Sequence, residues 1–217
     1  MGSTSQRTEA DAGAGEGRRA PPVLVVTGPS GVGKGTLIRR LRERVPGLAL
    51  STSATTRRPR RGEVDGRDYH FLSEDVFRLR VERGDFLEHA DYAGSSYGTL
   101  RSELERAGDR GLVLEIELHG ARQVRAALPE AVQVFIEPPS EGALRERLEA
   151  RGTDTPAQIA GRLARARDEL AARDEFRHRI VNDDLERAVD ELSRLAATIG
   201  GPHEATTGEP PGEGEPQ

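Results

Sequence analysis

Apolar and polar positions along the first part of the chain predict a strand, a helix and a second strand. Residues 23–26 form a continuous apolar run that is typical of a buried strand. After a glycine-rich stretch, apolar residues recur at helical spacing over 34–44, and Pro46-Gly47 ends that pattern. A second strand is expected at 48–53. A helix between two short strands is the βαβ unit of a parallel sheet.

The rest of the chain continues this alternation. Strands are expected at 86–90, 112–118, 132–136 and 180–181, and helices at 73–83, 100–107, 140–150, 156–176 and 185–198. Ser73 and Ser140 suit helix N-caps, and Pro156 suits a first helical position. The apolar side chains expected to be buried in three of these helices are Val76, Phe77, Leu79, Leu144, Leu148, Ile159, Leu163, Ala166 and Leu170, and the arginines expected to point outward are Arg145, Arg147 and Arg151.

Length and composition indicate one compact domain with disordered ends. The chain has 217 residues, of which 35% are hydrophobic, and it has no cysteine. Residues 1–20 and 201–217 lack the apolar positions of a folded segment, and the second of these tails is acidic. The net charge of -5 therefore leaves the folded part nearly neutral, which argues against nucleic acid as a partner. No apolar run suits a membrane span or an export signal, so we expect a cytoplasmic protein.

The stretch GPSGVGKGT, residues 28–36, lies between the first strand and the first helix. Gly28, Gly31 and Gly33 let backbone N–H groups converge on a polyphosphate, and the helix N-terminus adds partial positive charge. Lys34 is the only lysine although Lys and Arg together number 32, and a compact ammonium suits terminal phosphates. The stretch predicts a phosphate-binding loop, with a glycine-rich turn that binds nothing as the alternative.

One position departs from the usual motif of such a loop. A hydroxyl residue is expected directly after the lysine, but this chain has Gly35 there and Thr36 one step later. Glu115 and Glu117 stand at alternate positions of the strand predicted at 112–118, so they share one face and are expected to meet a cleft or a cation. The sequence leaves the ligands of Mg²⁺ open among Thr36, water and these two carboxylates.

Residues 54–66, ATTRRPRRGEVDG, predict an exposed loop that binds anions. Its arginines stand among proline and glycine, and Val64 is its only large apolar residue. All three tyrosines, Tyr69, Tyr92 and Tyr97, follow within the same part of the chain. Their clustering indicates a site, although tyrosines packed over a small sheet would also explain it.

These motifs together resemble the guanylate kinase family. The resemblance runs over about 21–198 and includes the phosphate loop, STSATTRRPRRGEVDGRDYHF (51–71), EIELHGARQVR (115–125), ERLEARGT (146–153), IAGRL (159–163) and VNDDL (181–185). It implies an α/β P-loop nucleoside-monophosphate kinase fold. A five-stranded parallel core would span 21–53 and 108–200, with a mixed α/β GMP-binding insert at 54–107 and a helical lid at about 147–162. The implied reaction is reversible transfer of the γ-phosphoryl group of ATP to GMP or dGMP, with Mg²⁺ accompanying ATP.

The resemblance also implies roles for individual residues. ATP is expected at Gly28, Pro29, Ser30, Gly31, Val32, Gly33, Lys34, Gly35, Thr36 and Asn182. The GMP phosphate is expected at Arg57, Arg60, Tyr69 and Tyr97, and its base at Ser53, Glu88 and Thr99, with Glu115 also counted in the GMP site. Lys34, Arg147, Arg151 and Arg162 are the expected catalytic cations. For the arginines on the predicted helices there is an alternative: they pair with Glu146 and Glu149 on a solvent-exposed helix face.

Base choice follows from hydrogen bonding. Guanine presents N1–H and its exocyclic amine side by side, and the Glu88 carboxylate can accept from both, whereas adenine presents an acceptor at N1. Two alternatives remain. The GKGT of the loop is also typical of adenylate kinases, and a guanylate-kinase-like module that binds phosphopeptides without catalysis would share the fold. The family usually has Asp where this chain has Glu115 and Glu117, and often has serine where it has Thr99.

Overall fold

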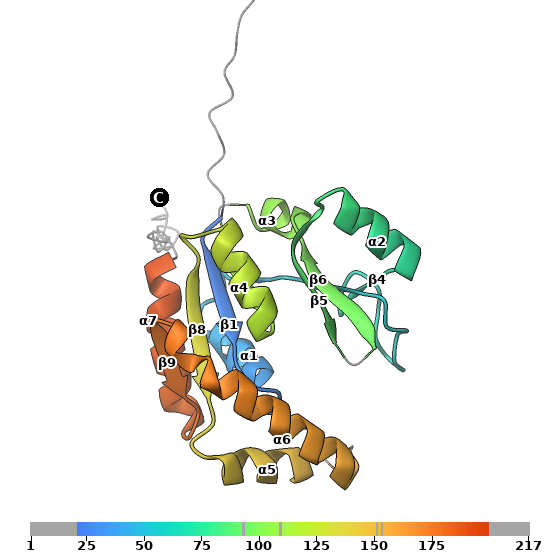
Figure 1. Cartoon of the computed structure of the whole chain (residues 1–217). Helices are drawn as coiled ribbons and strands as arrows, with labels where there is room; N and C mark the ends of the chain where they lie inside the picture. Colours follow the sequence, from blue (N-terminus) through green and yellow to red (C-terminus); the bar gives the residue numbers. More distant parts are fainter. Residues whose placement is uncertain (1–20, 93, 109, 151, 153, 200–217) are drawn as a thin grey trace, which may run out of the picture.

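The computed structural model describes residues 21–199 except 93, 109, 151 and 153, and a five-stranded sheet lies at its centre (Figure 1). The strand order is β2-β7-β1-β8-β9, and every neighbouring pair is parallel. The strands are β1 (Val23–Thr27), β2 (Ala49–Leu50), β7 (Leu112–Glu115), β8 (Val132–Glu137) and β9 (His178–Val181). The predicted α/β fold with a five-stranded parallel core is confirmed. The predicted tails lie outside the described residues.

Helices cover both faces of this sheet, as a parallel sheet with apolar strands requires. On one face, Leu41 and Leu192 share a buried cluster with Val26; on the other, Val124 shares a second cluster with Phe135. The helices of the first face are α1 (Lys34–Arg44) and α7 (Leu185–Ile199), and those of the second are α3 (Ser102–Ala107) and α4 (Leu118–Ala127).

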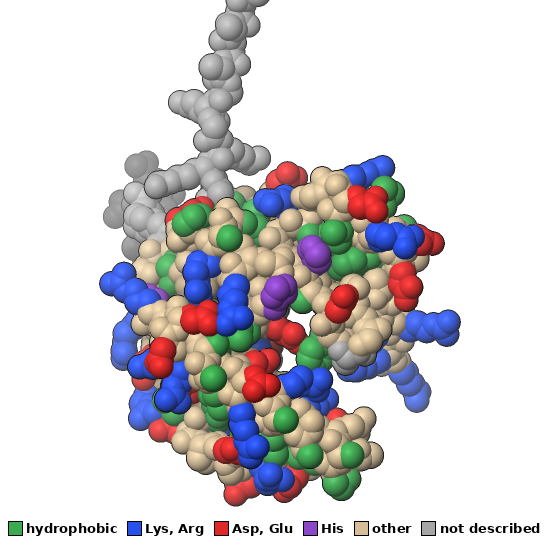
Figure 2. Space-filling model, in the orientation of Figure 1, with side chains coloured by type: hydrophobic (Ala, Val, Ile, Leu, Met, Phe, Trp, Pro, Cys, Tyr) green, Lys and Arg blue, Asp and Glu red, His purple; other side chains and the backbone are tan. Residues whose placement is uncertain are grey.

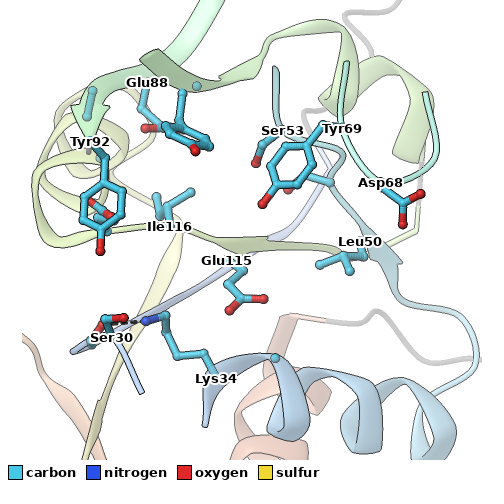
Figure 3. Close-up of a pocket in the computed structure, with 18 of the residues that line it drawn as sticks. Ser30, Lys34, Leu50, Ser53, Asp68, Tyr69, Glu88, Tyr92, Glu115 and Ile116 are labelled. Atoms are coloured by element: carbon cyan, nitrogen blue, oxygen red, sulfur yellow. Dashed lines mark hydrogen bonds between the residues drawn. The ribbon is translucent and has the colours of Figure 1, made fainter. Parts of the chain in front are cut away.

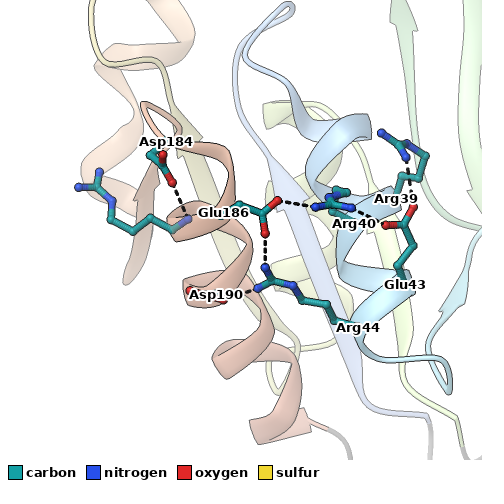
Figure 4. A network of polar contacts seen from close by, with 8 residues as sticks. Arg39, Arg40, Glu43, Arg44, Asp184, Glu186 and Asp190 are labelled. Atoms are coloured by element: carbon teal, nitrogen blue, oxygen red, sulfur yellow. Dashed lines mark hydrogen bonds and ion pairs between the residues drawn. The ribbon is translucent and has the colours of Figure 1, made fainter.

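An ion-pair network joins α1 to α7 on the outer surface (Figure 4). Arg40 contacts Glu186, and Arg44 contacts both Glu186 and Asp190. The side chains are a third to a half exposed, and exposed pairs of this kind contribute little to stability. The buried apolar residues of α1 are therefore what fixes this helix, and with it the loop that precedes it.

A second, mixed sheet stands beside the core (Figure 1). Its strand order is β4-β3-β6-β5, with β3 parallel to β4 and antiparallel to β6. Phe77 of the covering helix packs with Phe86 and Leu100 in a small core of its own. These elements are β3 (Ala54–Thr55), β4 (His70–Phe71), α2 (Glu74–Glu82), β5 (Phe86–Tyr92) and β6 (Ser95–Leu100).

Two helices form an arm that extends from the core below the second sheet in this view (Figure 1). They are α5 (Glu141–Ala150) and α6 (Pro156–Ala171), and they bury Leu144, Leu148, Ile159, Leu163 and Ala166 against each other as predicted. Thr155 and Gln158 form a capping box at the start of α6, which fixes where that helix begins. No helix within the described residues is long and apolar enough to cross a membrane.

The strand predicted at 48–53 is present but shorter, as β2 (Ala49–Leu50), because residues 51–53 pass from one sheet to the other. Ser51 N–H donates to Val113 O (3.0 Å) in the core, whereas Ser53 O accepts from His70 N–H (2.9 Å) in the second sheet. Between them, Thr52 N–H donates to the buried Glu103 carboxylate at 2.7 Å. A side chain from α3 therefore replaces the strand partner at the crossing, a contact that the local sequence pattern does not indicate.

Other boundaries also differ from the predictions. The strand predicted at 112–118 ends at Glu115, because Glu117 is the N-cap of α4, a helix that the apolar pattern did not predict. The helix predicted at 156–176 ends at Ala171 and is followed by a 3-10 turn, Arg173–Glu175, and Leu170 is only half-buried. Val76 and Leu79 are 41% and 43% exposed, because α2 packs on one side only.

Candidate functional site

The loop between β1 and α1 requires glycine where it lies close to β8 and to Asn182. Gly28 has φ +139°, and a Cβ there would lie 2.3 Å from Ile136 O of β8. Gly33 has φ +101°, and a Cβ there would lie 2.6 Å from the Asn182 side-chain nitrogen. Other residues strain at such φ values and would clash in this space. The glycines therefore hold the loop close to the carboxyl end of the sheet, where phosphate loops lie.

Side chains from three later segments hold this loop. Asn182 donates from its amide to Val32 O at 2.9 Å. Arg147 donates to Val32 O (3.1 Å) and to Asn182 O (2.7 Å), so the prediction that it points outward is wrong. Arg162 of α6 donates to Ser30 Oγ at 3.2 Å and pairs with Asp154. Arg151, the other predicted lid cation, lies outside the described residues.

Lys34 lines a cleft of about 740 Å³ above the loop (Figure 3). The space-filling view shows a hollow between the arm and the second sheet (Figure 2). The Lys34 ammonium donates to Gly28 O at 2.6 Å and to Pro29 O at 3.2 Å, so it is folded over the loop. The predicted residues that line the cleft come from both of its sides: Gly28, Ser30, Gly31, Gly33, Lys34, Gly35, Thr36, Ser53, Arg57, Arg60, Tyr69, Glu88, Tyr97, Glu115 and Glu117.

The arginine-rich loop forms the far wall of the cleft. Arg57 makes a two-pronged pair with Glu63, with N···O distances of 3.0 and 2.8 Å, and its guanidinium lies 5.2 Å from the Tyr69 ring centre. Hydrogen bonds from Arg57 and from Arg60 N–H lower the pKa of the Glu63 carboxyl. Glu63 was not among the predicted site residues, yet it orients Arg57 into the cleft.

Glu88 is the most deeply buried acid of this wall. Only 5% of the residue is exposed, and the buried Thr99 hydroxyl donates to its Oε1 at 2.7 Å. Burial raises the pKa of the Glu88 carboxyl, and the Thr99 hydrogen bond opposes that rise. Thr99 therefore contacts Glu88 in the structure, and its contact with the base, which the family resemblance implies, stays a prediction.

Three further carboxylates face Lys34 from different elements. Glu115, on β7, lies between Lys34 and Tyr69 (Figure 3). Glu117 lies at the start of α4, and Glu169 lies on α6. Burial raises the pKa of all three carboxyls, and the positive charge of Lys34 opposes the rise. Glu169 was not predicted; its spacing of seven from Arg162 on one helix was the signal that could have found it.

The arm also touches the far wall. The guanidinium of Arg165 on α6 lies 5.3 Å from the centre of the Tyr92 ring, a cation–π contact across the cleft. Arg165 was not predicted either. Together with Arg162 at the loop, this contact means that α6 contacts both sides of the cleft.

The parallel sheet, its phosphate loop and the second sheet across the cleft define a P-loop protein of the nucleoside-monophosphate kinase class. The family model described as guanylate kinase matches residues 20–198. A guanylate kinase of Gloeobacter violaceus is 53% identical over 186 residues, covering 85% of this chain and 91% of that one. One of Rubrobacter xylanophilus is 50% identical over 179 residues, covering 82% and 94%.

A solved structure supports the same assignment. The crystal structure of guanylate kinase from Anaplasma phagocytophilum superposes with a TM-score of 0.67 at 29% identity, covering 85% of this chain and 88% of that one. The chain belongs to the guanylate kinase family. It is thus an ATP-dependent nucleoside-monophosphate kinase, as the sequence resemblance predicted.

The buried Glu88 carboxyl has a consequence for stability. Because its pKa is raised on folding, the folded state binds a proton more tightly than the unfolded state, so stability falls as the pH rises above the unfolded value of about 4.3. Glu88→Gln keeps an acceptor for Thr99 and removes this loss. We expect its Tm to exceed the wild-type Tm at pH 7 and to approach it near pH 4, in thermal unfolding followed by circular dichroism.

The exposed Glu82 serves as the matched control, and Glu82→Gln should change the Tm only slightly at pH 7. If Glu88→Gln is less stable than wild type at pH 7, the claim that the ionised Glu88 carboxylate lowers the stability of the folded state is contradicted.

Proposed function

We propose that the cleft binds ATP at the loop over 28–36 and GMP against the second sheet, and that the chain transfers the γ-phosphoryl group between them in the cytoplasm. The observation that carries this proposal is that Lys34 and Glu88 line one cleft of about 740 Å³, from opposite walls. A cleft of that volume suits two nucleotides brought end to end. The same arrangement supports an insert at about 54–107 that binds GMP and a lid at about 147–162.

On the donor side, backbone N–H groups of the loop and the N-terminus of α1 would receive the phosphates of ATP. Lys34 would leave the carbonyls it now contacts and follow the terminal phosphates, since a charged acceptor binds an ammonium more strongly than a carbonyl does. Arg162 reaches the loop already through Ser30 and would stabilise the transferring group. Arg147 would act through the loop, because its donors are directed to Val32 and Asn182.

On the acceptor side, Arg57, Arg60, Tyr69 and Tyr97 would bind the GMP phosphate. Forked guanidinium contacts suit a dianion, and Glu63 together with the Tyr69 ring already holds Arg57 in position. This preorganisation lowers the conformational entropy lost on binding.

For the base, Glu88 would accept from guanine N1–H and from the exocyclic amine, and Ser53 would donate to O6. Thr99 holds one Glu88 oxygen by hydrogen bonding, which fixes the carboxylate plane for this paired contact. Adenine would bring its N1 acceptor against the carboxylate. The adenylate kinase alternative is disfavoured for this reason, and the binding-module alternative is disfavoured because Lys34 and Arg162 are both present at the loop.

Phosphoryl transfer to GMP needs no general base, because the attacking phosphate oxygen is already ionised. Mg²⁺ takes one or two protein carboxylates plus substrate phosphates. Glu115, Glu117 and the Thr36 hydroxyl are the oxygen donors beside Lys34 that would hold it. The bound ion would neutralise phosphate charge during transfer.

A coupled assay of ADP release tests the acceptor. With ATP and Mg²⁺, we expect GMP and dGMP to support turnover, and AMP, UMP and CMP to be poorer by about 10⁴-fold in kcat/KM, because a site built for paired donors rejects a base that lacks them. The five acceptors are compared at equal concentration with the same enzyme. Equal rates with AMP and GMP would contradict the guanine assignment, and no ADP with any acceptor would support the binding module.

Lys34→Ala tests the donor side. We expect kcat to fall by about 10²-fold or more, because a cation that stabilises developing charge is lost, while GMP binding measured by calorimetry stays unchanged. Arg44→Ala, on the same helix but in the outer ion-pair network, is the control and should keep wild-type kcat. Normal turnover of the Lys34→Ala enzyme would refute the phosphate-loop role.

A further inference from the structure

Helix α4 meets strand β5 directly behind Glu88. Through this contact the helix that covers the core sheet packs against the second sheet. None of the α4 residues was given a role in binding either nucleotide. Two of them, Gly120 and Gln123, contact β5 in ways that general packing does not require.

Gly120 leaves the space that the Glu88 carboxylate fills. A Cβ at Gly120 would lie 2.4 Å from Glu88 Oε2, closer than real Cβ contacts allow, and 3.0 Å from its Cδ. Gly120 lies within α4, where glycine costs about 1 kcal/mol relative to alanine. An alanine here would push the carboxylate away from α4, and Glu88 is buried and bound to Thr99 on its other side.

Gln123, one turn further along α4, holds the backbone beside Glu88. Its side-chain Oε1 accepts from His89 N–H at 3.1 Å, and its Nε2 donates to His89 O at 2.7 Å. The amide thus pairs with the main chain of β5 as a neighbouring strand would. These two hydrogen bonds hold His89, the residue next to Glu88, at a fixed distance from α4.

We infer that α4 sets the position of Glu88 for guanine binding, with Gly120 and Gln123 as positioning residues that determine base selectivity. The inference deepens the proposed function and rests on it. Gly120 supplies the space, Gln123 fixes the strand, and Thr99 fixes one oxygen. These three contacts fix the position of the Glu88 carboxylate without a bound nucleotide. That position therefore depends on α4 of the core as well as on the second sheet.

The test compares Gly120→Ala and Gln123→Met with wild type, using GMP and IMP as acceptors. IMP lacks the exocyclic amine and offers Glu88 one donor instead of two. We expect KM for GMP to rise about 10-fold or more in Gly120→Ala, since a hydrogen bond to a charged group is worth that factor, and less in Gln123→Met. The preference for GMP over IMP should shrink in both, and KM for ATP should stay unchanged.

Gly142→Ala is the matched control, because Gly142 also lies within a helix but a Cβ there makes only an ordinary contact. Thermal melting shows which variants fold. If Gly120→Ala does not fold, the kinetics of Gln123→Met test the inference. Folded variants with wild-type KM for GMP and an unchanged GMP-to-IMP ratio would overturn the inference, as would equal losses toward ATP and GMP. A wild-type protein inactive on GMP would instead overturn the proposed function.

Discussion

The fold depends on how closely the loop over 28–36 approaches the edge of the core sheet. Gly28 lies against the backbone of β8, and Gly33 lies against Asn182, in spaces that no side chain can enter. This approach brings Lys34 and the start of α1 to the base of the cleft. The apolar faces of α1 and α7 maintain it from below, while Asn182 and Arg147 bind Val32 from the side.

Charge in the cleft is arranged before any ligand is present. Arg57 is paired with Glu63 on one wall, and the carboxylates around Lys34 occupy the other side. Glu88, Glu115 and Glu117 each have a raised pKa, so their ionised carboxylates cost stability. Active sites commonly combine such cost with function. Substrate phosphates and their cation would replace these internal pairs with stronger ones.

Local sequence predicted the core well, because residues 23–44 carry strong strand and helix patterns next to an unusual glycine spacing. It did not predict the crossing at 51–53, where Glu103 from another helix supplies the partner, or the start of α4 directly after Glu115. The phosphate loop and most cleft residues were found from motifs. Arg165 and Glu169 were missed because they meet segments that are distant in the sequence. Glu63 was missed although its partner Arg57 lies in the same loop, because loop composition does not show which charges pair.

Calorimetry with separate ligands tests most directly the claim that one cleft holds two independent nucleotide sites. GMP and a nonhydrolysable ATP analogue with Mg²⁺ are titrated singly into wild type and into Glu88→Gln. We predict that each ligand binds wild type alone, and that Glu88→Gln weakens GMP by about 10-fold or more while the ATP analogue binds as before. Equal weakening of both ligands, or GMP binding unaffected by the substitution, would contradict the account.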